Sequence, residues 1–215
     1  MTPRYGSWWP LLLWAGVLCT AGCSSGAPRR TYLLTPPIAP TAPSTTTPAL
    51  RLEVRRILIP DYLDSPDILM RSGSDEVKAS ATGRWGERLS QGLTHAVGAD
   101  LAARMPQYSI VQDGSGTTQR QLRVTISALD LWPEGRCVLA ANWSIVDPDS
   151  SIPMTTGSGT FETMNAGGPA AVSDANLVEA IARTLGKLAD SIVSDAQASP
   201  ERADVRGTSK TLTAD

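Results

Sequence analysis

Two stretches of alternating apolar and polar residues constrain the fold of this chain more than any other feature. Every second residue is apolar or small from Leu122 to Ala128, and again from Cys137 to Ile145. A period of two is that of a strand that buries one face and leaves the other in water. We therefore predict a sheet with one face covered by other elements.

Two stretches with helical period can supply that cover. Over residues 84–105 apolar side chains such as Trp85, Leu89 and Leu93 fall on one helical face. A second helix is expected to begin at Ser173-Asp174, which has good N-cap chemistry, and to run past Ile192. Further strands are expected within 50–59, 67–71, 76–80 and 155–163, the first of them with a bulge. The sequence predicts an α+β domain, a mostly antiparallel or mixed sheet with two long helices packed on one face.

An apolar run near the N-terminus ends in small residues and a cysteine. Residues 8–19 are too short to span a bilayer, which takes about 20 residues. With Arg4 before them, they have the layout of a secretory signal peptide. Ala21-Gly22 directly before Cys23 resembles the bacterial lipobox, in which the cysteine thiol receives a diacylglyceryl group and the chain is cut before it.

We therefore predict a signal peptide over residues 1–22 and a lipid anchor on Cys23. The alternative is an unmodified signal peptide with a chance cysteine. Two or more acyl chains would give stable membrane attachment. Ser24, rather than aspartate, follows the cysteine, which favours the outer membrane.

Only Cys137 would remain as a thiol, so no internal disulfide can form and the fold must rest on an apolar core. Its place on a strand face predicts burial. Without residues 1–22 the chain keeps 18 basic and 21 acidic residues. This near-neutral balance argues against nucleic-acid binding and against charge-driven binding to an anionic membrane.

Composition divides the rest of the chain. Residues 23–49 are expected to be a lipidated, Pro/Thr-rich tether, 50–197 the folded domain, and 198–215 a disordered tail.

The sequence offers little for catalysis. His95, the only histidine, is placed away from the apolar face of its helix, and no typical zinc ligand set or G-x-S-x-G nucleophile motif is present. Asp100 is either a buried functional carboxylate or the ion-pair partner of Arg104, and the spacing favours the pair. We expect no catalytic residue, no metal and no cofactor beyond the covalent lipid.

The segment "PDYLDSP" places Tyr62 and Leu63 between two acids and two prolines. This aromatic-apolar pair either forms a docking knob for a partner or folds back on the core.

The order of lipobox, "TYLL", the Tyr-Leu-Asp-x-Pro run and a later Arg-Trp resembles the ABC-type transport auxiliary lipoproteins. The chain departs from that pattern at Ser65 and at 86–88. The matching positions are 31–34, Ile57, Pro60, Tyr62, Leu63, Asp64, Pro66, Ile68, Arg71, Arg84, Trp85 and Leu89.

The resemblance implies a non-catalytic protein on the periplasmic face of the outer membrane of a Gram-negative bacterium. Such proteins are auxiliary subunits of systems in which MCE-domain proteins, with an inner-membrane permease in some cases, move lipids or other hydrophobic molecules. It also implies that residues 31–34 can add a strand to the sheet, and that Tyr62 and Leu63 are candidates for partner binding. A tubular partner would suit a ring of identical subunits. The rival interpretations are another envelope lipoprotein, such as an assembly factor or a secretin pilot, and a periplasmic enzyme.

Overall fold

The computed structural model describes residues 28–34, 50–112, 114, 120–148, 153–165 and 173–208. The predicted signal peptide and Cys23 lie outside the described residues, as does most of the predicted tether.

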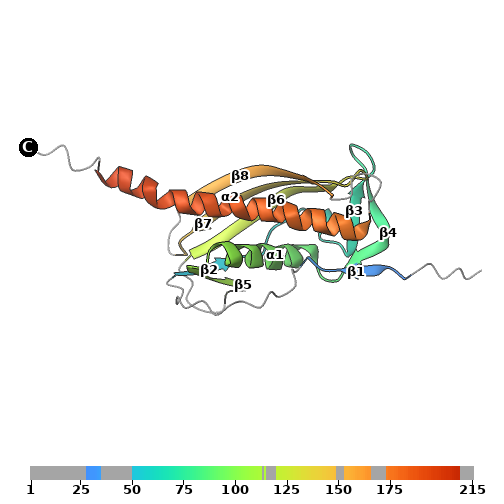
Figure 1. Cartoon of the computed structure of the whole chain (residues 1–215), viewed down its shortest axis with the longest axis horizontal. Helices are drawn as coiled ribbons and strands as arrows, with labels where there is room; N and C mark the ends of the chain where they lie inside the picture. The colour runs from blue at the N-terminus through green and yellow to red at the C-terminus, as the bar shows by residue number, and fades with distance from the viewer. Residues whose placement is uncertain are drawn as a thin grey trace, which may run out of the picture.

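The described residues form two sheets and two long helices (Figure 1). The larger sheet has the strand order β5-β2-β6-β7-β8. In it β2 pairs in parallel with β5 and β6, while β6, β7 and β8 are antiparallel neighbours. Its strands are β2 (Leu50–Val54), β5 (Tyr108–Gln112), β6 (Arg120–Leu131), β7 (Arg136–Val146) and β8 (Pro153–Met164).

The smaller sheet has the order β1-β4-β3 and lies at one end of the molecule (Figure 1). β1 (Arg30–Tyr32) runs parallel to β4 (Val77–Trp85), and β3 (Asp67–Arg71) runs antiparallel to it. The strand implied for 31–34 is present in part, since β1 covers residues 31 and 32 of that stretch, and it joins this smaller sheet.

Helices α1 (Leu89–Arg104) and α2 (Asp174–Thr208) lie side by side on one face of the larger sheet (Figure 1). The predicted α+β class is confirmed. Apolar side chains fill the space between helices and sheet, and those fully buried include Leu52, Leu93, Leu101, Leu122, Ile126, Leu139, Leu177, Ile181 and Leu185. Within the described part of the chain, no helix is both long and apolar enough to cross a membrane.

Strand β7 has the ends that its alternation predicted. Cys137, Leu139, Ala141 and Trp143 are buried on the face toward the helices. Asn142, which points to the other face, is exposed. In β6 the same alternation is broken by a bulge between Ile126 and Ala128. A bulge inserts one residue, so Leu129 faces inward although it is out of phase with Ile126.

Helix α1 starts later than predicted. The helical period suggested a start near Arg84, but Arg84 and Trp85 end strand β4. There the Trp85 N–H donates to the Pro66 carbonyl at 2.8 Å, and the Gly86 N–H donates to the Tyr32 carbonyl at 2.8 Å. Strand pairing on both sides therefore competes successfully with the helix, and Trp85 is buried in the strand as it would have been in the helix.

Two further elements differ from expectation. The predicted bulged strand over 50–59 is β2 followed by a break, after which Leu58 alone rejoins β6 opposite Thr125. Strand β5 was not predicted, because its five residues are all partly buried and show no alternation.

Helix α2 extends to Thr208, beyond residue 198, where the tail was expected to begin. Residues 209–215 lie outside the described residues. The Ser173 cap is present, since its Oγ accepts a hydrogen bond from the Asn176 N–H at 3.3 Å.

Candidate docking site

The segment that contains Tyr62 forms a single 3-10 turn, η2 (Asp61–Leu63). The turn is closed by hydrogen bonds from the Leu63 N–H to the Pro60 carbonyl at 2.9 Å and from the Asp64 N–H to the Asp61 carbonyl at 3.2 Å. Leu63 is only 5% exposed, whereas Tyr62 is 45% exposed. Each of the two open interpretations therefore applies to one residue of the pair. Leu63 folds back on the core, whereas Tyr62 stays accessible to a partner.

Leu63 packs into the junction between the two sheets and the helices. It lines a small internal gap together with Leu69, Trp85, Leu89, Leu129, Leu131 and Ile181. These residues come from both sheets and both helices. Leu63 is therefore part of the contact that holds the elements together.

Asp64 caps helix α1 from a distant part of the chain. Its Oδ1 accepts a hydrogen bond from the Ser90 N–H at 3.0 Å, and its Oδ2 accepts one from Arg88 at 3.3 Å. This matters because Arg88, the N-cap residue of α1, makes no side-chain cap hydrogen bond. Desolvation raises the pKa of Asp64, but the hydrogen bonds from Ser90 and Arg88 and the charge of Arg88 outweigh it and lower the pKa.

Two more of the matching positions join separate elements. The Arg71 guanidinium donates to Asp130 of β6 at 2.8 Å and so ties the small sheet to the large one. The Ile57 N–H donates to the Thr94 hydroxyl of α1 at 3.0 Å. Leu63, Asp64, Arg71 and Ile57 all have a role within the fold, and Tyr62 is the large apolar residue of the run that stays exposed.

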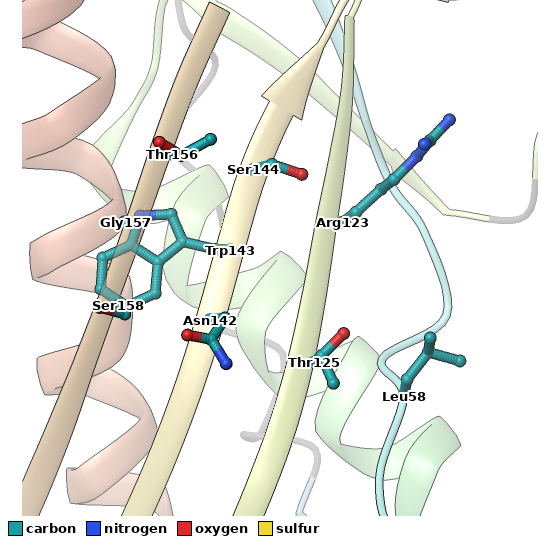
Figure 2. Close-up of a pocket in the computed structure, with 9 residues that line it drawn as sticks. All are labelled: Leu58, Arg123, Thr125, Asn142, Trp143, Ser144, Thr156, Gly157 and Ser158. Atoms are coloured by element: carbon teal, nitrogen blue, oxygen red, sulfur yellow. The ribbon is translucent and has the colours of Figure 1, made fainter. Parts of the chain in front are cut away.

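A second surface is the face of the larger sheet opposite the helices. A groove of about 640 Å³ crosses β6, β7 and β8 there. Figure 2 shows the side chains that line it. Polar side chains line it, and Leu58, 63% exposed, stands at its border. Trp143 also lines the groove, although it is only 5% exposed. Its side chain points toward α2, where Nε1 donates to Asp195 at 3.1 Å. The polar lining residues are Arg123, Thr125, Asn142, Ser144, Thr156 and Ser158.

The titratable residues singled out from the sequence lie in ion pairs within the fold. Asp100 pairs with Arg104 at 2.7 Å, as expected, and Arg104 also reaches Asp190 of α2 at 2.6 Å, so this arginine clamps the two helices. His95 is partly exposed and lies 3.4 Å from Glu87.

Cys137 is buried, as predicted, and desolvation raises the pKa of its thiol to about 11. In the part of the chain that the structure describes, no group of three or more His, Cys, Asp or Glu side chains could hold a metal ion.

Sequence reasoning missed the groove on the open sheet face. Its serine, threonine and asparagine residues occupy the outward positions of predicted strands, where polar residues are ordinary. The exposure of Leu58 follows the break after β2 and could not be read from the sequence.

Comparison with known proteins assigns the family. Residues 32–193 match the family described as the ABC-type transport auxiliary lipoprotein component. The chain belongs to this family. The family is non-enzymatic, so the chain is not an enzyme but an auxiliary lipoprotein of a transport system in the cell envelope.

The chain is similar to the intermembrane transport lipoprotein PqiC of Escherichia coli. The two are 25% identical over 133 residues, which span 61% of this chain and 71% of the relative. The protein of the same name from Shigella flexneri matches to the same extent.

Two solved structures share the fold. One is a crystal structure of an uncharacterized protein, with a TM-score of 0.63 at 17% identity. The match covers 78% of this chain and 98% of that protein. The other, of a protein from Xanthomonas campestris, has a TM-score of 0.58 at 13% identity. The match covers 75% of this chain and 93% of that protein.

Proposed function

We propose that this protein is an auxiliary subunit of an MCE-type intermembrane transport system, held on the periplasmic face of the outer membrane by a lipid on Cys23. It acts by surface contact with its partners, an MCE-domain protein and the inner-membrane permease of the same system, and needs no cofactor besides its lipid. The transported molecules are lipids or other hydrophobic compounds. The observation that carries the proposal is the family match over most of the folded domain together with the Ala-Gly-Cys sequence before Ser24.

The structure supports Tyr62 as the candidate contact residue of the Tyr-Leu-Asp-x-Pro run. Tyr62 is 45% exposed on a turn that is fixed by the two residues after it, through burial of Leu63 and the Asp64 cap on α1. A rigid turn presents an aromatic side chain at low entropic cost, and aromatic side chains are enriched among residues that dominate binding. Leu63 is proposed to support this turn from the core.

The partner proposal is tested by co-purification. The full chain, extracted from membranes, should retain an MCE-domain protein of its own organism. Tyr62→Ala should weaken this retention about tenfold, as loss of an interface anchor does. Met164→Ala is the matched control because Met164 is also 45% exposed, on β8.

The outcomes separate the two levels of the proposal. Full retention by Tyr62→Ala would remove Tyr62 from the contact but leave the function standing. Failure of the wild-type chain to retain any MCE-domain protein of its organism, in detergent and in membranes, would overturn the function. A ring of identical subunits, which a tubular partner would suit, is tested on the same preparation by its mass.

The anchor is tested by mass spectrometry of the mature N-terminus. We expect an acylated cysteine followed by Ser24, and an unprocessed or soluble product from Cys23→Ala. An unmodified N-terminus at another residue would exclude the anchor.

A further inference from the structure

We propose that the exposed face of the small sheet rests on the phospholipid bilayer to which Cys23 attaches the chain. This inference rests on the proposed lipid anchor and adds an orientation of the domain on the membrane. We call this surface the anchor face, and it comprises Arg29, Thr31, Leu33, Asp67 and Arg84.

Strand register places these residues on one side of the sheet. Thr31 of β1 and Asp67 of β3 are both paired with Arg84 of β4, and paired residues point to the same face. A methyl group added at Gly86 would lie 2.9 Å from both the Thr31 and the Leu33 side chains, so these two cover the same backbone. Arg29 donates to Asp67 at 3.2 Å across this face.

The opposite side of the small sheet is covered by the protein itself. A methyl group added at Gly83 would lie 3.0 Å from the Tyr32 ring and 2.7 Å from the carboxyl carbon of Asp174, the first residue of α2. The two sides of this segment therefore differ: Tyr32 is turned toward α2, whereas Leu33, directly after β1, is 56% exposed.

The position of the anchor selects the bilayer as the partner of this face. Only seven residue steps separate Cys23 from Arg30 at the start of β1, and a fully extended chain covers at most about 25 Å in that number. The lipid is therefore held within about 25 Å of the small sheet, and the far end of α2 lies at the opposite end of the molecule (Figure 1).

The side chains of the anchor face suit the interface of a phospholipid bilayer. Leu33 can enter the boundary between head groups and acyl chains, while arginine side chains keep their guanidinium groups at the level of the phosphates. Arg84 is exposed and makes no ion pair with any of the described residues, so it is free to bind a phosphate oxygen pair.

This contact does not depend on the net charge of the chain, which is negative. The lipid anchor already holds the face at a high effective concentration near the surface, so a weak contact is enough to orient the domain.

The test uses the full, lipidated chain in vesicles of phosphatidylethanolamine and phosphatidylglycerol. An environment-sensitive fluorophore is attached in Leu33→Cys and, as the control, in Met154→Cys, whose native side chain is 47% exposed at the start of β8. Cys137 does not compete for the label because it is buried. We expect nitroxide-bearing lipids to quench the label at 33 and to leave the label at 154 unquenched. Adding Arg84→Glu should reduce quenching at 33 about twofold or more, because the carboxylate would repel lipid phosphates.

Three results would overturn the inference. If the chain floats with the vesicles but neither label is quenched, the anchor stands and the orientation is wrong. If the label at 33 shifts to the blue without quenching by nitroxide lipids, a second copy or another protein covers the face instead. If the lipidated chain does not bind vesicles, the anchor proposal and the inference fail together.

Discussion

Replacing Leu63 with alanine should destabilise the fold by about 3 to 4 kcal/mol, whereas Tyr62→Ala should cost less than about 1 kcal/mol. The two residues are neighbours in one turn, so the pair of variants separates burial from position. Leu63 is 5% exposed, and the substitution removes three carbons from among side chains of both sheets and both helices.

The magnitude follows from two contributions. Each buried carbon contributes about 0.8 kcal/mol, or roughly 2.5 kcal/mol for three. A cavity of about 50 Å³ left by incomplete relaxation would add about 1 kcal/mol. In a domain of this size 1 kcal/mol corresponds to about 2 to 4 °C, so the melting temperature of Leu63→Ala should fall by roughly 6 to 16 °C.

Urea unfolding followed by far-UV circular dichroism measures both free energies of unfolding. Equal unfolding midpoints for the two variants, or a midpoint for Leu63→Ala within experimental error of wild type, would refute the division of the turn into a buried and an exposed residue.

Two other consequences concern ionisation. Asp64→Ala should lower the free energy of unfolding by about 1 kcal/mol at pH 7, because the α1 cap is lost. Since the folded-state pKa of Asp64 is lowered, this difference from wild type should shrink as pH falls below about 4, and a pH-independent difference would contradict the prediction. Asp61→Ala is the control for the neighbouring acid. The Cys137 thiol, buried and with its pKa raised to about 11, should react with a thiol reagent at pH 8 only after denaturation, and rapid labelling of the folded chain would contradict its placement in β7.

The elements that could be predicted are those whose pattern is complete within a short stretch of chain. β7 has its period of two from Cys137 to Ile145, and α2 has both a cap at Ser173 and a helical stripe. The same reasoning misplaced the start of α1, because Trp85 is apolar and fits a buried position in a helix or in a strand. Only the pairing of β4 with β1 and β3, remote in sequence, distinguishes the two.

The candidate site depended even more on contacts between distant residues. Asp64 caps a helix residue 26 positions away, and Arg71 reaches Asp130 over 59 positions. Neither partner is visible in a local pattern, so the sequence left Tyr62 and Leu63 as one undivided candidate. The open sheet face is likewise assembled from three strands, and no single strand predicts a groove.

The long axis of the molecule follows β6, β7 and β8, with the small sheet at one end (Figure 1). The hydrogen bonds between these antiparallel strands lie perpendicular to that axis. A pull along that axis would slide the strands past one another, and many bonds would have to break together. Resistance to such a pull is set by the barrier to unfolding rather than by equilibrium stability. The larger sheet is thus oriented to resist a pull along the long axis as one unit, without peeling open strand by strand.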